Sequence, residues 1–541
     1  MSTIVGYTDE VADDYLIKID MAKSWNWKTN VSETALIKKE NPSTGTLPPV
    51  MSRGALFYGS DSDANIYLYG GAVSYVNSSF PGFHSPQPAQ YALWSYDPSQ
   101  DQWGQYDTSL SVANRPSSGS FAEARDQQLG FFFNGMLEKG SQVSTESFGY
   151  NDNVFLNGMV VVNTGDHTAR NLSTTAVVGD QPRARGRMQY VEDVGGRGIL
   201  VQIGGKQFRE GMQSGGEVGD LVPLDTVDVF DVSSLYNSST PNGTWYKQKT
   251  YGDIPPARID FCLVLASPTD QSSRNIYMYG GRSSNGTDDL YLDDVWVLSI
   301  PSFTWTILYN GTAPRFGHTC HRVGERTMIT VGGASNINYT ELPCDWEYEG
   351  VGVLDMSEVI WGSYFNASAS DYKVPTLLSR TIGGDEGGNA SLQQPQGGFD
   401  QEGLARMFNV PWIPKPSPGS PSNTSSASPP SVGAHRAATV PIIGGITGGV
   451  ASLGLISSVM IFYRRRLKRL FIDGSWPFEE LDGQMKAQAE LETVTKTPRC
   501  ELPAYEPAEL SGSARATMEP VLPRTIPPLW APPVTDEGVP F

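Results

Sequence analysis

Cysteine, histidine and basic residues are all scarce in this chain. Among 541 residues there are only four cysteines and five histidines. So few cysteines cannot form the dense disulfide framework of a small secreted domain. The 39 Lys and Arg residues face 58 Asp and Glu residues, which gives a net charge of -19. This balance argues against a nucleic-acid partner, because phosphate binding needs clustered basic side chains, and the acidity is interpreted as a contribution to solubility.

Sequence motifs of common catalytic sites are also missing. The chain has no nucleophile elbow, no zinc-binding His/Glu motif and no glycine loop that would hold a phosphate. The carboxylates of Asp288, Asp289, Asp293 and Asp294 are interpreted as a solvated loop, with a calcium site as the weaker alternative. We therefore predict a protein that is not an enzyme, with no cofactor and no metal.

The sequence is rich instead in short apolar runs separated by Gly, Pro, Asn and Asp, a pattern typical of strands and turns. Residues 255–333 contain one order of features twice. An arginine precedes a first strand, a second strand ends on two glycines, and a third strand is followed by a tryptophan. The arginines of the two copies are Arg258 and Arg315. A recurring group of four strands predicts a β-propeller, in which each group forms one blade.

Further copies of this order occur upstream. Residues 53–103 and 183–245 hold recognisable copies, whereas the copy between them is degenerate, with Gly135 alone in place of a glycine pair. Residues 14–29 resemble only the third and fourth strands of a blade. The count favours an all-β propeller of six blades, one of them incomplete, and Val374–Gly384 is a candidate for the strand that completes it.

The paired glycines and the tryptophans carry a resemblance to a known family. The pairs and the rings stand at Gly70, Gly71, Gly204, Gly205, Gly280, Gly281, Gly332 and Gly333, and at Trp103, Trp245, Trp305 and Trp361. Over residues 10–385 the chain resembles a kelch-repeat β-propeller, the fold of the central domain of galactose oxidase. Paired glycines would let each second strand turn through a backbone conformation closed to other residues. The tryptophans would pack between blades, and the two arginines named above would bond to carbonyls of an adjacent turn.

One long uncharged run lies in the last quarter of the chain. No charged residue occurs from Val440 to Tyr463, a length that suffices to span a bilayer core. Basic residues follow at once, from Arg464 to Arg469. Because positive charge stays on the cytoplasmic side, we expect residues 439–463 to form a transmembrane helix with the N-terminal portion outside the cell. The whole chain thus resembles the membrane-anchored kelch proteins of filamentous fungi.

The segments that flank this run have a biased composition. Residues 386–438 are rich in Pro, Ser and Gly and are predicted to form a flexible stalk. Residues 464–541 show little apolar periodicity and are predicted to be a disordered cytoplasmic tail.

Acceptor motifs for N-glycosylation support the same orientation. All eleven precede the apolar run, at Asn30, Asn77, Asn171, Asn237, Asn242, Asn285, Asn310, Asn338, Asn366, Asn389 and Asn423. An exported domain ahead of a single span needs a signal peptide, and residues 1–10 have neither a basic start nor an apolar run. We therefore expect the natural chain to begin upstream of Met1.

The cysteines allow two interpretations. Cys320 and Cys344 flank a glycine pair, so a local disulfide between them is one hypothesis for an oxidising compartment. Two free, buried thiols are the alternative. Cys262 lies within a strand pattern and is predicted to belong to the core.

The resemblance leaves two kinds of function open. The first is adhesion or sensing at the cell surface, with a protein or cell-wall glycan bound by the propeller loops. The second is a carbohydrate oxidase of the galactose-oxidase type, whose family holds copper with Tyr and His. His318 and His321 are the closest imidazole pair, but on a strand they would point to opposite faces, so the binding protein is preferred. Glycines spaced by four within residues 444–449 also suggest that two spans could associate as a homodimer.

Overall fold

The computed structural model describes residues 3–4, 15–29, 31–73, 92–108, 115–149, 151–213, 219–284, 289–335 and 351–409. These residues belong to the first of two compact units, which spans residues 1–485. The predicted transmembrane helix and tail lie outside the described residues. Within the described residues, no helix is both long and apolar enough to cross a membrane.

Six main sheets follow one another along the described chain, and neighbouring strands within each run antiparallel except where noted. The first three consist of β1 (Thr3–Ile4), β2 (Tyr15–Asp20) and β4 (Glu33–Ile37); β6 (Ala55–Tyr58), β7 (Ile66–Tyr69), β9 (Leu93–Asp97) and β10 (Gln102–Tyr106); and β11 (Ser120–Ala124), β12 (Leu129–Phe133), β15 (Met159–Asn163) and β16 (Thr168–Leu172). The fourth consists of β18 (Arg187–Val191), β19 (Ile199–Ile203), β23 (Thr226–Asp231) and β24 (Thr244–Lys249).

The last two main sheets have the same order. The fifth consists of β26 (Cys262–Ala266), β27 (Arg274–Tyr279), β30 (Asp294–Ile300) and β31 (Thr304–Asn310), with β25 (Tyr251–Gly252) added in parallel beside β31. The sixth consists of β32 (Thr319–Val323), β33 (Thr327–Val331), β34 (Val351–Asp355) and β35 (Ile360–Gly362). The second to sixth sheets thus each contain the four strands that the sequence pattern predicts for a blade, and the fifth has β25 in addition.

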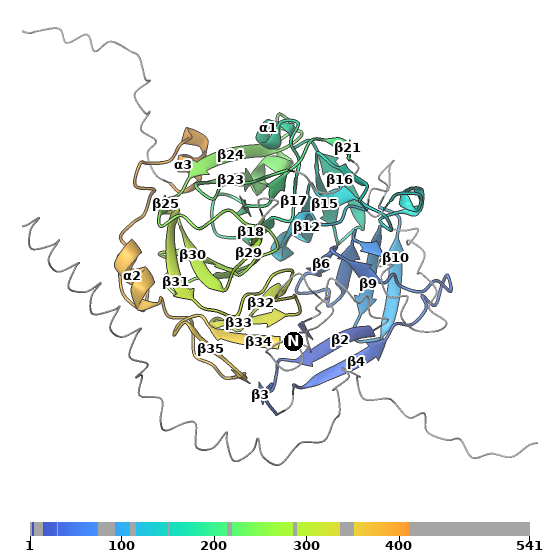
Figure 1. The fold of residues 1–541 in the computed structure, drawn as a ribbon, viewed down its shortest axis with the longest axis horizontal. Coiled ribbons are helices and arrows are strands. Elements are labelled where there is room, and N and C mark those ends of the chain that lie inside the picture. The colour runs from blue at the N-terminus through green and yellow to red at the C-terminus, as the bar shows by residue number, and fades with distance from the viewer. Residues whose placement is uncertain are drawn as a thin grey trace, which may run out of the picture. The chain divides into compact units, whose positions relative to one another are not determined.

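The sheets are arranged radially around a common centre (Figure 1). The first strands β6, β18 and β32 lie toward the centre, and the last strands β10, β24 and β35 lie toward the rim. First strands of consecutive sheets contact one another, from β6 through β11, β18 and β26 to β32. This arrangement is that of a β-propeller.

The hydrophobic core lies between consecutive sheets. One cluster joins Val201 of the fourth sheet to Leu298 of the fifth, and four others fill the gaps between the remaining neighbours in the series. A further cluster joins Ile19 of the first sheet to Val353 of the sixth. Because every sheet is covered on both faces, its central strands read as continuous apolar runs, such as β7, in which every side chain is buried.

Short accessory strands extend from the ends of the second strands. They are β5 (Met51–Ser52) with β8 (Ala72–Val73); β13 (Met136–Leu137), β14 (Asn153–Phe155) and β21 (Gly211–Gln213); β17 (Arg183–Ala184), β20 (Lys206–Gln207) and β22 (Asp220–Leu221); and β28 (Arg282–Ser284) with β29 (Asp289–Tyr291). In each group, chain that follows the turn after a second strand pairs with chain that precedes a first strand or with a neighbouring loop. We call the surface formed by these strands and their loops the accessory face.

The first sheet differs from its prediction. Residues 14–29 were predicted to form its third and fourth strands, the fourth at the tryptophans Trp25 and Trp27. Only Trp25–Asn26 is extended, as β3, and it pairs with β36 (Tyr364–Phe365) near the end of the described chain. The position beside β2 that was predicted for Trp25 and Trp27 is occupied by β4. The N-terminal sheet and the last repeat are therefore joined by backbone pairing, which the spacing of the tryptophans did not reveal.

The C-terminal part of the described chain also differs from its prediction. The candidate strand at residues 374–384 is instead the helix α2 (Thr376–Ile382), which contacts β31. Residues 386–409, which were assigned to the stalk, pack on the sheets and contain α3 (Glu402–Met407), whose Leu404 is fully buried. The short helix α1 (Thr175–Val178) lies in a loop after β16.

Residues 400–401 cover the rim of the fourth sheet. The backbone N–H of Lys249 donates to the Asp400 carboxylate (2.6 Å), and that of Lys247 donates to the side-chain oxygen of Gln401 (2.9 Å). Both lysines belong to β24. These contacts satisfy donors along the edge of an outer strand, which would otherwise be open to pairing with another chain.

Candidate functional site

The predicted glycine pairs form the turns at the ends of the second strands. All eight glycines have positive φ. A Cβ atom on Gly280 would lie 2.4 Å from the carbonyl oxygen of Arg315, and one on Gly281 would lie 2.7 Å from that of Ile259. In this turn, backbone that leads into the fifth and sixth sheets comes so close to the two glycines that a Cβ atom does not fit. In the degenerate third sheet the same turn is made by Asn134 and Gly135, with φ of 51° and 89°, and asparagine is among the residues that tolerate this region.

Two buried arginines bond to these turns, as the sequence predicted. Arg258 donates from Nη1 to the carbonyl oxygen of Gly280 (3.0 Å), and Arg315 donates from Nη1 to that of Gly332 (2.6 Å). Arg258 also pairs with both carboxylate oxygens of Asp294, at 2.5 and 3.0 Å. The interpretation of Asp293 and Asp294 as a solvated loop is wrong, because both side chains are buried and hydrogen-bonded.

Ion pairs connect neighbouring repeats on the accessory face. Arg53, which precedes β6, pairs with Glu138 beyond the next turn at 2.7 Å. Asp260 accepts from Arg185 at 3.3 Å and from Arg282 at 3.0 Å. Burial acts to raise the pKa of Asp260, but Arg185 and Arg282 outweigh burial and hold that pKa below its ordinary value. The carboxylate therefore stays charged and fixes three separate segments of the face.

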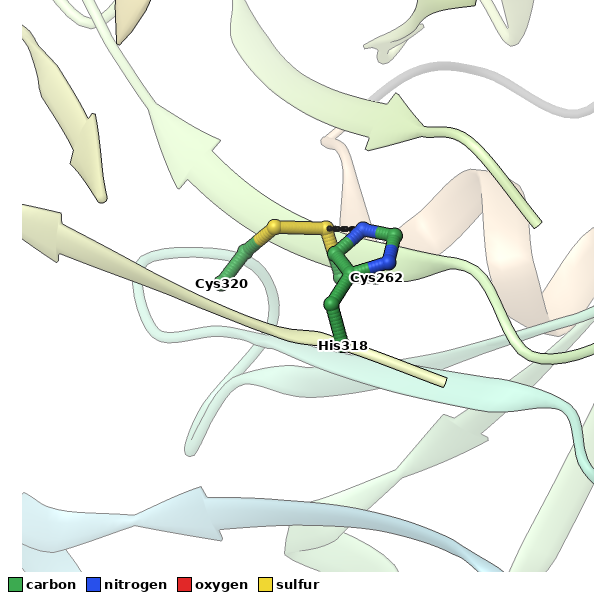
Figure 2. A group of neighbouring side chains, drawn as sticks. All are labelled: Cys262, His318 and Cys320. Carbon is green, nitrogen blue, oxygen red and sulfur yellow. Dashed lines mark hydrogen bonds between the residues drawn. A yellow bond between two sulfur atoms is a disulfide. The ribbon is translucent and has the colours of Figure 1, made fainter. Parts of the chain in front are cut away.

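A disulfide joins the first strands of the fifth and sixth sheets. It links Cys262 at the start of β26 with Cys320 on β32 (Figure 2). His318 precedes β32 and is fully buried, and its Nε2 atom lies 3.1 Å from Sγ of Cys262. Burial, reinforced by the charges of Arg315 and Arg187, lowers the pKa of His318 well below its ordinary value. A neutral imidazole and two sulfur atoms thus meet near the centre of the ring of sheets.

Comparison with known proteins bears on the repeats. No family model matches the chain. The chain is 27% identical over 526 residues to a kelch repeat-containing protein of Arthroderma benhamiae, a match that covers 86% of this chain and 72% of that protein. It is also 30% identical over 152 residues to host cell factor of Drosophila melanogaster, which covers 27% of this chain and 9% of that protein. The matches support a kelch-repeat protein.

Each of the four predicted tryptophans lies against the preceding sheet. Trp305 is fully buried, and its Nε1–H donates to the carbonyl oxygen of Leu224 (3.1 Å), ahead of the third strand of the fourth sheet. The other three rings also contact residues of the preceding sheet: Trp103 shares a cluster with Leu16, Trp245 lies 5.2 Å from the Phe133 ring, and Trp361 lies 4.5 Å from the Tyr279 ring. The four rings thus pack between consecutive sheets, as the resemblance implied.

The prediction of a disulfide between Cys320 and Cys344 is wrong. Cys320 pairs with Cys262 and not with Cys344, which lies outside the described residues. The prediction relied on nearness in sequence around one glycine pair. The observed pair is 58 residues apart, and it forms because first strands of consecutive repeats are neighbours at the centre. Nothing local to either cysteine identifies the other as its partner, so the sequence analysis missed this pair.

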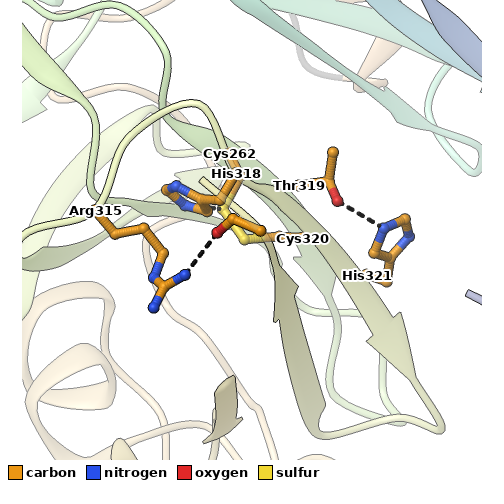
Figure 3. Close-up of a disulfide and its surroundings, with 7 residues drawn as sticks. Cys262, Arg315, His318, Thr319, Cys320 and His321 are labelled. Atoms are coloured by element: carbon orange, nitrogen blue, oxygen red, sulfur yellow. Dashed lines mark hydrogen bonds between the residues drawn. A yellow bond between two sulfur atoms is a disulfide. The ribbon is translucent and has the colours of Figure 1, made fainter. Parts of the chain in front are cut away.

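The histidines that were considered for copper do not converge. His318 faces the disulfide, whereas Nε2 of His321 lies 3.1 Å from Oγ1 of Thr319, away from His318 (Figure 3). The predicted opposite orientation of the two rings explains why. Residues that could share an ion are instead Cys262, His318 and Cys320.

The glycosylation candidates divide into two groups. Asn30, Asn77, Asn285, Asn338 and Asn423 lie outside the described residues. The others are exposed: Asn171, Asn237, Asn242, Asn310, Asn366 and Asn389.

Proposed function

We propose that this chain is a cell-surface binding protein whose kelch repeats engage a protein partner through the accessory face. The similarity to kelch-repeat proteins supports a protein as the binding partner. The accessory face offers a surface suited to such a partner. The observation that carries the proposal is the set of ion pairs around Asp260 and Glu138, which holds loops from different repeats in one arrangement. A preorganised surface binds more tightly because little ordering entropy is lost on association.

The accessory face also exposes apolar side chains. Val143, in the loop between β13 and β14, is 65% exposed, and Leu290 on β29 is 54% exposed. Arg282 packs over the Phe316 ring, with 5.3 Å between its guanidinium carbon and the ring centroid. Apolar and arginine side chains with a polar surround are the composition typical of binding hot spots.

Site-specific photo-crosslinking in cells tests this proposal. A photoreactive amino acid would replace Val143 or Leu290 in the full chain, and the matched controls would carry it at Ile37 or Ile360, which are 64% and 61% exposed on outer strands. We expect a discrete protein adduct from the two positions on the accessory face and none from the controls. Equal labelling from all four positions, or labelling of a glycan in place of a protein, would overturn the proposal.

We further propose that residues 439–463 hold the repeats outside the cell. The support is the uncharged run, the basic residues after it and the eleven acceptor motifs before it. Treatment of the membrane fraction with a glycosidase specific for N-linked glycans should increase the mobility of the full chain on a gel. Unchanged mobility, together with release of the chain from membranes by alkaline carbonate, would refute this placement.

A further inference from the structure

Two cysteines and one histidine meet at the junction of the fifth and sixth sheets. Cys262 is 2% exposed and His318 is fully buried, whereas Cys320 is partly exposed. One ligand atom from each of the three residues lies within 4.8 Å of those from the other two. Figure 2 shows a nitrogen of the imidazole ring directed at the sulfur atom of Cys262, which is bonded to that of Cys320. Two sulfurs and an imidazole nitrogen form the donor set that soft metal ions select.

We infer that, when the disulfide is reduced, Cys262, His318 and Cys320 bind a single thiophilic metal ion, and that Cu(I) is the ion that suits the site. The oxidised and metal-bound forms are then two alternative states of one cross-link. The inference does not depend on the proposed function.

The chemistry balances with a dithiol as the reductant. The dithiol gives two electrons and two protons, the Sγ–Sγ bond breaks, and the dithiol becomes a disulfide while Cys262 and Cys320 become thiols. Metal binding then displaces the two thiol protons, so that two thiolates and the Nε2 atom of His318 face the ion. The partly exposed Cys320 is the sulfur that a reductant can attack.

The surroundings favour a monovalent ion. Arg315 and Arg187 both act electrostatically on His318, and two nearby guanidinium groups disfavour a dication more than a monocation. Two thiolates with Cu(I) carry one net negative charge, which these arginines stabilise. Cationic neighbours also favour the thiolate over the thiol. Zinc is less suited, because structural zinc sites take four protein ligands and the described residues supply three.

The two states would leave the packing of the repeats largely intact. β26 and β32 contact each other along the centre of the ring of sheets, and either a disulfide or a bound ion ties them together. Reduction in the presence of the metal would therefore exchange one link for another, whereas reduction without it would remove the link.

Titration of the reduced full chain with Cu(I) tests the inference. Cys344 and Cys500 would first be replaced by serine, so that only two of the four cysteines remain. The chain would be reduced with a phosphine without oxygen and titrated against a chromophoric Cu(I) chelator. We expect one Cu(I) per chain, with two sulfur ligands and one nitrogen ligand in its X-ray absorption spectrum.

Three variants complete the test. Cys320→Ser and His318→Gln should each weaken Cu(I) binding by about tenfold or more. His321→Ala is the matched control, because His321 contacts Thr319 and not the sulfurs, and it should bind Cu(I) like the parent. The melting temperature of oxidised His318→Gln, compared with the parent, shows whether that variant is folded, and Cys320→Ser tests the site at a less buried position.

Three results would overturn the inference. The first is no competition for Cu(I) by the reduced parent. The second is retained 1:1 binding in Cys320→Ser and in folded His318→Gln. The third is preferential binding of Zn²⁺, which would refute the assignment of the ion.

Discussion

Replacing Gly280 by alanine would test whether the paired-glycine turns fix the distance between neighbouring sheets. Gly280 has φ of +64°, and a Cβ atom there would lie 2.4 Å from the carbonyl oxygen of Arg315, which leads into the sixth sheet. Left-handed backbone alone costs a residue with a Cβ about 1 kcal/mol, and forced overlap in a packed region adds about 1–3 kcal/mol. We expect the free energy of unfolding to fall by about 2–4 kcal/mol.

A second glycine provides the control for this substitution. Gly45 has nearly the same φ, +68°, but no atom lies within 4 Å of the Cβ position. Gly45→Ala should therefore lose only the backbone part, about 1 kcal/mol. Both variants of the full chain would be unfolded with urea in mild detergent and followed by tryptophan fluorescence. Equal losses in the two variants would refute the argument that contact between the sheets restricts Gly280.

Three further predictions concern individual side chains. Arg258→Met should destabilise the protein by about 3–5 kcal/mol because it leaves the Asp294 carboxylate buried without its cation, and Arg258→Met combined with Asp294→Leu should recover most of this loss in the same urea assay. Burial raises the pKa of Glu123 to about 7, so the stability that its protonated form contributes is lost as pH rises from about 4.5 to 7, at about 1.4 kcal/mol per pH unit at most. Glu123→Gln cannot ionise, so its free energy of unfolding should lack this pH dependence. Parallel pH profiles of the two proteins would contradict the assignment. Trp305→Ala should cost about 3–5 kcal/mol and more than Trp361→Ala, because only Trp305 is fully buried; the reverse order of melting temperatures would count against its role as a wedge.

The repeats could be predicted from sequence because their signals are local. Short apolar runs and glycine pairs at fixed spacing specify strands and turns within each group, and the arginine ahead of β26 lies on the turn that the pattern predicted. Even the degenerate turn at Gly135 has the expected position and a positive φ. Four-stranded sheets follow from such patterns without knowledge of their neighbours.

The segment 374–384 shows where local signals mislead. Gly383 and Gly384 have positive φ, like a kelch turn, and the preceding apolar residues resemble a strand. However, Leu378 and Ile382 are four residues apart, and both are buried on one side of α2. Their spacing is helical, so packing against the neighbouring sheet decided between two patterns that the sequence contains together.

The candidate metal site could not be predicted because it depends on adjacency between repeats. Cys262 and Cys320 belong to different sheets, and nothing in either segment specifies the other as its partner. Only the order of first strands around the centre brings them together and places His318 beside them.

The contacts of residues 400–401 with β24 have a mechanical consequence. Tension applied to the chain beyond residue 409 would reach this region before it reached the junction of β3 with β36, because the segment after β36 returns past β31 to the rim of the fourth sheet. The bonds to Lys247 and Lys249 and the buried Leu404 would have to yield first. A tether attached beyond residue 409 would thus load the outer contacts of residues 400–401 and Leu404 first. The pairing of β3 with β36, which joins the first and last repeats, would carry no load.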